Sequence, residues 1–154
     1  MKLSQLLSAL GGSCAQDPEI RQLTCDSREA APGALFAALP GHRADGRAHI
    51  PEALYRGAAA VVCAPPLPQG VPGAAVDDPR AALALLAAQF YGRPGDDLSL
   101  IAVTGTKGKT TTAHMIRDIL SAAGYKTGMI GTLGAYIGRE KLSDSPNTTP
   151  EPIA

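Results

Sequence analysis

Residues 103–112, which read VTGTKGKTTT, constrain the fold of this chain more than any other stretch. An apolar run rich in strand formers precedes them at residues 98–103, and apolar residues at helical spacing follow as far as Gly124. A strand, a glycine-bearing turn and a helix in this order hold a nucleotide phosphate, because backbone N–H groups and the positive helix N-terminus face the anion. The pattern predicts that Lys109 reaches the β- and γ-phosphates and that the Thr110 hydroxyl binds Mg²⁺.

The spacing of this loop departs from the usual phosphate-loop pattern at its first glycine. That glycine normally lies five positions before the Gly-Lys-Thr triplet, where this chain has Val103, and the first glycine is Gly105 instead. The alternative is an ordinary glycine turn before a helix. Lys107 and Lys109 argue against it, because the helix dipole disfavours cations at a helix start unless an anion is bound.

Length and composition exclude several other classes of protein. A chain of 154 residues suits one domain of typical size or two small ones. The formal net charge is zero and aromatic residues make up 4%, so neither a basic field nor a stacking platform for nucleic acid is expected. We see no membrane span or signal peptide and expect a soluble, cytoplasmic protein. Cys14, Cys25 and Cys63 lack paired ligand spacing and are expected to be reduced, without zinc.

The order of predicted elements indicates an α/β fold in two parts. We expect a small α/β domain at residues 1–92, a linker at 93–97, and the first part of a phosphate-loop domain at 98–154. In the first domain we expect helices at 2–10, 50–56 and 79–91, strands at 20–25, 35–39, 59–63 and 74–76, and a polar loop at 40–47. In the second part, residues 127–132 are expected to form a parallel strand that completes a βαβ unit, followed by a hairpin over 135–142.

Four segments, taken together and in this order, resemble the Mur ligases, the ATP-dependent amino-acid ligases of peptidoglycan precursor synthesis. They are Asp26-Ser27-Arg28, then 33–46, 104–111 and 147–150. The resemblance covers the whole chain and is strongest to the members that add the third peptide residue. Folylpolyglutamate synthetases share the phosphate loop but lack the domain with Asp26-Ser27-Arg28. The members that add D-Ala-D-Ala usually have a different loop and lack Asn-Thr-Thr-Pro at this place.

The resemblance implies the ligands and the residues that bind them. ATP and Mg²⁺ would be the cofactors, and the partners would be a UDP-N-acetylmuramoyl dipeptide and an amino acid, diaminopimelate or lysine. Residues implied for ATP are Gly105, Thr106, Lys107, Gly108, Lys109, Thr110 and Thr111, with Lys109 catalytic and Thr110 on the metal. Residues implied for the UDP-muramoyl substrate are Cys25, Ser27, His42, Arg43, Ala44, Asn147, Thr148 and Thr149. The family usually has Asn at position 107, so the role of the Lys107 side chain does not follow from the family.

Mur ligases are roughly three times as long as this chain, so we interpret it as an N-terminal portion that is inactive alone. We expect the residues after about Asp96 to be only marginally stable, because one βαβ unit and a hairpin leave an open sheet edge. Two alternatives stay open: a non-catalytic module that binds ATP or a UDP-sugar, and an unrelated phosphate-loop phosphotransferase. Arg28 could either pair with Asp26 or meet the UDP phosphates. The oligomeric state and the identity of the third amino acid do not follow from these residues.

Overall fold

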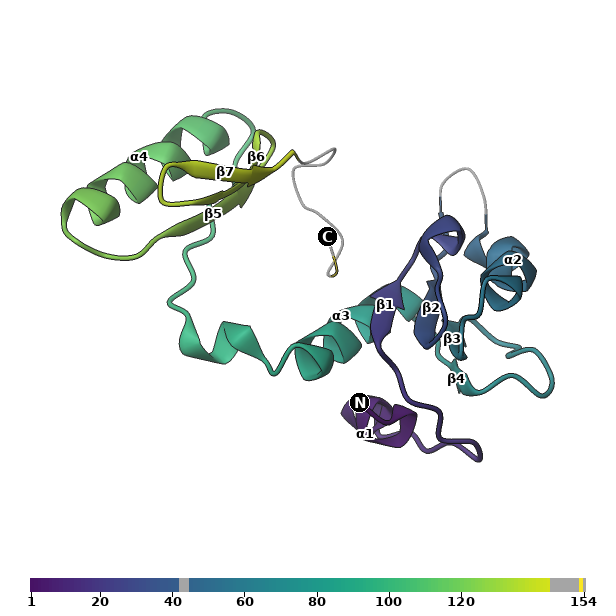
Figure 1. The fold of residues 1–154 in the computed structure, drawn as a ribbon. Helices are drawn as coiled ribbons and strands as arrows, with labels where there is room; N and C mark the ends of the chain where they lie inside the picture. The colour runs from purple at the N-terminus through teal and green to yellow at the C-terminus, as the bar shows by residue number, and fades with distance from the viewer. Residues whose placement is uncertain (42–44, 145–152, 154) are drawn as a thin grey trace. The chain divides into compact units, whose positions relative to one another are not determined.

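The computed structural model describes residues 1–41, 45–144 and 153, and it divides the chain into two compact units. Unit 1 comprises Met1–Leu98, and unit 2 begins at Ser99 (Figure 1). The helices of unit 1 are α1 (Leu3–Leu7), α2 (Ile50–Tyr55) and α3 (Pro79–Phe90), with short 3₁₀ turns η1 (Ser8–Leu10), η2 (Ser27–Glu29), η3 (Gly46–His49) and η4 (Pro94–Asp97). Its strands are β1 (Gln22–Thr24), β2 (Ala34–Ala38), β3 (Ala60–Cys63) and β4 (Gly73–Ala75).

The four strands of unit 1 form one parallel sheet in the order β1-β2-β3-β4. Strands β2 and β3 are buried along their whole length, as expected for central strands covered on both faces. Successive side chains of a strand point to opposite faces, so each of these strands contributes to two separate cores. On β3, Val62 belongs to one core, and Val61 and Cys63 belong to the other.

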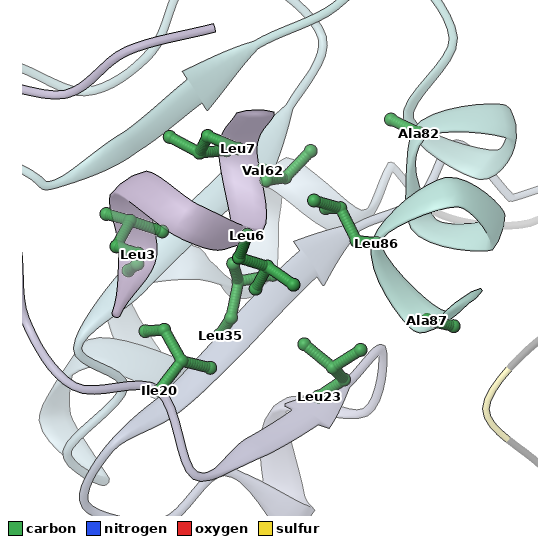
Figure 2. Close-up of a cluster of buried hydrophobic side chains, with 11 residues drawn as sticks. Leu3, Leu6, Leu7, Ile20, Leu23, Leu35, Val62, Ala82, Leu86 and Ala87 are labelled. Atoms are coloured by element: carbon green, nitrogen blue, oxygen red, sulfur yellow. The ribbon is translucent and has the colours of Figure 1, made fainter. Parts of the chain in front are cut away.

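Helices pack on both faces of the sheet, so unit 1 has three layers with one core on each side of the sheet. The larger core, shown in Figure 2, packs Leu3, Leu6 and Leu7 of α1 and Leu86 of α3 against the strands. The smaller core packs α2 on the other face and contains Ala30, Phe36, Ala38, Ile50, Ala53, Val61 and Cys63. Full burial of each leucine contributes about 1.5–3 kcal/mol, so α1 and α3 fix this face of the sheet. The expected α/β class and the expected strands of this unit are therefore confirmed.

In the residues that the structure describes, up to residue 144, unit 2 has one α-helix beside a small antiparallel sheet. Helix α4 spans Lys109–Ala122, and strands β5 (Gly128–Gly131), β6 (Gly134–Ile137) and β7 (Glu140–Ser143) form a meander. The Tyr136 ring lies 5.7 Å from the His114 ring and 5.6 Å from the Arg117 guanidinium, so aromatic and cation–π contacts join the helix to β6. The expected helix and the expected hairpin, now β6 and β7, are confirmed.

Two expectations for unit 2 are wrong. Residues 98–103 form no strand, because within the described part of the chain nothing pairs with them and a strand requires a hydrogen-bonded neighbour. Residues 127–132 contain β5, but this strand runs antiparallel to β6 and completes no βαβ crossover. The short connection to β6 explains the difference, since two adjacent strands joined by a tight turn pair antiparallel.

Candidate functional site

The loop before α4 is the predicted phosphate-binding loop. Gly105 and Gly108 have φ of 144° and 78°, which favour glycine. Gly108 is also the N-cap of α4, and a glycine has no side chain that could accept hydrogen bonds from the first turn. The first N–H groups of α4 therefore face outward without a side-chain cap, where the positive end of the helix dipole favours an anion.

Lys109 lies across this loop. Its ammonium nitrogen donates a hydrogen bond of 2.6 Å to the carbonyl oxygen of Gly105. This contact holds the ammonium at the start of the loop, and a bound phosphate could replace the carbonyl as its partner. Thr110 is half-buried in the first turn of α4, whereas Thr106 and Lys107 are exposed. A threonine hydroxyl fits one position in the oxygen shell that Mg²⁺ prefers, with the remaining positions left to phosphate and water.

A second group of polar residues lies at the carboxyl edge of the parallel sheet in unit 1. Cys25 follows the last residue of β1, and Ser27 begins the turn η2. Ligands of open parallel α/β sheets bind outside the carboxyl ends of their strands, so this edge is a physically reasonable place for a nucleotide. Ser27 is buried, with 6% of its surface exposed.

Arg28 pairs with Asp26 in this turn. The Asp26 carboxylate caps η2 by accepting the backbone N–H of Arg28 at 2.9 Å, and it accepts the Arg28 guanidinium as well. The side-chain hydrogen bond from Arg28, followed by the backbone one, lowers the pKa of Asp26 to about 2. Of the two roles considered for Arg28, the structure shows the one that stiffens the turn.

The base of the loop that follows β2 lies at the same edge. Pro40 and Asp45 form an antiparallel bridge, and the Gly46 N–H donates to the Leu39 carbonyl oxygen at 3.0 Å. A Cβ at Gly46 would lie 2.5 Å from that oxygen, so only glycine permits this close approach. Arg47 joins the base to the loop after β3 by donating to the Pro65 carbonyl oxygen at 3.1 Å.

The described residues bring only some of the predicted site residues together. Cys25 and Ser27 lie beside each other at the carboxyl edge, and residues 105–111 form the loop and first turn of α4. The other predicted substrate residues lie outside the described residues; they are His42, Arg43, Ala44, Asn147, Thr148 and Thr149. In the described ranges no cluster of three His, Cys, Asp or Glu side chains is placed to hold a metal ion, and no helix is long and apolar enough to cross a membrane.

Sequence reasoning did not identify Glu52 as part of the polar group at the carboxyl edge of the sheet in unit 1. Glu52, in the first turn of α2, accepts a hydrogen bond of 2.7 Å from the Ser27 hydroxyl. The two residues are 25 positions apart, so no local spacing signals their contact. Only the packing of α2 on the sheet face beside η2 brings them together.

The fold is of the α/β class, with a parallel α/β unit that precedes, in the sequence, a glycine-bearing loop and helix α4. Two family models match this chain: the one described as the Mur ligase family, catalytic domain, over residues 19–91, and the Mur ligase middle domain over residues 103–154. The chain belongs to the Mur ligase family and comprises N-terminal and middle-domain sequence of that family.

Individual relatives agree with this assignment. The UDP-N-acetylmuramoyl-L-alanyl-D-glutamate–2,6-diaminopimelate ligase of Geobacillus thermodenitrificans is 46% identical over 99% of this chain and 32% of the ligase. The chain thus spans about a third of the length of the curated relatives that it matches.

Two solved structures share the fold. A structure of a UDP-N-acetylmuramoyl-L-alanyl-D-glutamate–2,6-diaminopimelate ligase aligns with a TM-score of 0.71 at 24% identity, covering 100% of this chain and 31% of that one. The MurF ligase of Thermotoga maritima in complex with ADP aligns with a TM-score of 0.52 at 32% identity, covering 66% of this chain and 23% of that one.

Proposed function

We propose that this chain is the N-terminal part of an ATP-dependent ligase that joins diaminopimelate to UDP-N-acetylmuramoyl-L-Ala-D-Glu. The observation that carries the proposal is the match to a 2,6-diaminopimelate ligase along 99% of the chain, which includes both the phosphate loop and the cluster at Ser27. The name of that relative supplies the choice of diaminopimelate over lysine. The ADP complex of the Thermotoga maritima relative supports ATP as the nucleotide.

The reaction needs the carboxylate of the dipeptide to be activated, because an ionised carboxylate is a poor acyl donor. In the proposed reaction a carboxylate oxygen attacks the γ-phosphorus of ATP, ADP leaves, and an acyl phosphate forms. The amine of diaminopimelate then attacks the acyl carbon, phosphate leaves, and the amine loses a proton. Negative charge spreads over the transferring phosphoryl oxygens, so the phosphate site must supply positive charge and N–H donors.

The residues of the phosphate loop match these needs. We assign the charge to Lys109 and the backbone cradle to residues 105–111. Mg²⁺, when bound, would neutralise phosphate charge, and the Thr110 hydroxyl would be one of its ligands. Cys25 and Ser27, with the residues implied at 42–44 and 147–149, would hold the UDP-muramoyl substrate.

The phosphate-loop assignment is tested by ATP binding to the purified chain in the presence of Mg²⁺, measured by calorimetry. We expect Lys109→Ala to weaken ATP binding about 10- to 100-fold, because a hydrogen bond to a charged group contributes about 1.5–3 kcal/mol. Lys126→Ala, which removes an exposed lysine beyond the end of α4, is the matched control and should leave the affinity unchanged. Equal ATP affinity in Lys109→Ala and wild type would contradict the assignment.

A further inference from the structure

A hydrogen bond between Ser27 and Glu52 lies at the proposed uridine site and determines whether the Ser27 hydroxyl can donate or accept a further hydrogen bond. The Ser27 Oγ lies 2.7 Å from the Glu52 Oε2 and joins the turn η2 to helix α2. The other carboxylate oxygen of Glu52, Oε1, lies 3.3 Å from the Arg56 Nε one turn along the helix. Both oxygens of the Glu52 carboxylate therefore accept a hydrogen bond.

The chemistry of the two groups decides which of them donates. An ionised carboxylate only accepts hydrogen bonds, whereas a hydroxyl has one proton to donate and two lone pairs to accept with. The hydrogen bond from Ser27, together with Arg56, lowers the pKa of Glu52, so its carboxylate is ionised at neutral pH. The Ser27 proton is thus committed to Glu52, and only the lone pairs of its oxygen are left for another partner.

We propose that Glu52 is a positioning residue that turns the Ser27 hydroxyl into an obligatory hydrogen-bond acceptor, so that the site selects a donor group of the uridine nucleotide. This inference rests on the proposed function, which places the UDP-muramoyl substrate at Ser27. The donors of a uridine nucleotide are the N3–H of uracil and the ribose hydroxyls. Phosphate oxygens and the uracil carbonyls, which only accept, are excluded as partners of this hydroxyl.

A cytosine nucleotide provides the discriminating probe. Cytosine has a lone pair at N3 where uracil has an N–H, so an acceptor at this place disfavours CDP. A site built to bond a ligand N–H or O–H rejects an analogue without it, because a protein group is then left unpaired. In Glu52→Gln the carboxamide can accept from Ser27 or donate to it, which frees the hydroxyl to face either base.

The experiment compares binding of UDP, CDP and 2′-deoxy-UDP to the full chain by calorimetry, for wild type, Glu52→Gln, Ser27→Ala and the double variant. We expect wild type to prefer UDP over one analogue by about tenfold or more. That preference should fall at least fivefold in Glu52→Gln and in Ser27→Ala, with no further loss in the double variant. Loss of discrimination against CDP identifies the uracil N3–H as the donor, and loss against 2′-deoxy-UDP identifies the ribose 2′-hydroxyl.

Each remaining outcome overturns the proposal. If Glu52→Gln weakens all three nucleotides equally, or none of them, then Glu52 only joins α2 to η2. If wild type binds no UDP, both the proposed function of this unit and the role of Glu52 fail. Glu29→Gln, the same change at an exposed residue of η2, is the matched control and should keep the wild-type preference. Ser27→Ala carries the test if Glu52→Gln does not fold, as judged by thermal melting.

Discussion

At the scale of single residues, the Asp26–Arg28 pair makes the stability of unit 1 depend on pH. The pKa of Asp26 is about 2, against its ordinary value of 3.8, so its ionised form stabilises the folded state. This contribution is fully present above about pH 4 and is lost as pH falls through about 2. We expect Asp26→Asn to lower the free energy of unfolding by at most about 1 kcal/mol at neutral pH, because it removes the charge paired with Arg28 in a partly exposed, screened ion pair, whereas the asparagine oxygen can still cap η2.

Urea denaturation of both proteins between pH 7 and pH 2 measures this effect. The two unfolding free energies should converge toward pH 2, and Asp77→Asn, at an exposed aspartate, should follow wild type throughout. A gap between Asp26→Asn and wild type that persists unchanged at pH 2 would show that the Asp26 charge is not its source.

The structural roles of some residues can be predicted from the neighbouring sequence, whereas those of others cannot. The places of Lys109 and Thr110 follow from spacing alone, because a short turn and the first turn of a helix are local structures. Glu52 shows no such signal, since its partner Ser27 is 25 residues away and their contact depends on helix packing. The sequence left two roles open for Arg28; the geometry of η2 shows its pairing with Asp26, and a contact with the UDP phosphates stays a prediction.

At the scale of elements, helix α3 offers a test of how the larger core holds unit 1 together. Leu86 is fully buried against the sheet, whereas its neighbour Leu85 is 52% exposed. We expect Leu86→Ala to lower the free energy of unfolding of unit 1 by about 2–5 kcal/mol, because it removes buried apolar surface and leaves a cavity. Leu85→Ala should change it by less than about 0.5 kcal/mol, and equal effects of the two substitutions would contradict this placement of α3.

The elements of unit 1 follow from sequence better than those of unit 2, and pairing explains why. Strands β2 and β3 are continuous apolar runs between turn residues, and α3 begins at Asp78 and Pro79, so local signals agree with the packing. Residues 98–103 have an equally strong strand signal, yet within the described residues they pair with nothing. The direction of β5 also depends on which strand is beside it, and a short apolar run does not specify its neighbour.

At the scale of the whole molecule, the two units should differ sharply in stability. Unit 1 has two buried cores, whereas no residue of α4 is buried, and Met115 and Ile119 of that helix are 59% and 68% exposed. We expect amide hydrogens of β2 and β3 to exchange at least about 100-fold more slowly than those of α4, because local opening costs little where few apolar contacts form. Hydrogen exchange followed by NMR measures this, and equal protection of α4 and β3 would contradict it.

The low stability expected for unit 2 also leads us to expect that this 154-residue chain binds nucleotides without forming an amide bond. Acyl-phosphate formation requires ATP, the dipeptide carboxylate and positive charge to be held at reacting distance, an alignment that supplies several kcal/mol of the barrier. At the phosphate loop the described residues provide the Lys109 ammonium and the Thr110 hydroxyl for the roles assigned above, and the relatives named as ligases are about three times as long. Because α4 has no buried residue, the loop before it should bind ATP weakly and position it poorly.

To test this expectation, the purified chain is supplied with ATP, Mg²⁺, UDP-N-acetylmuramoyl-L-Ala-D-Glu and diaminopimelate, and phosphate release and product mass are followed. Tripeptide product above the level given by Lys109→Ala would show that these residues already contain the catalytic groups, and would direct the search for them to unit 2.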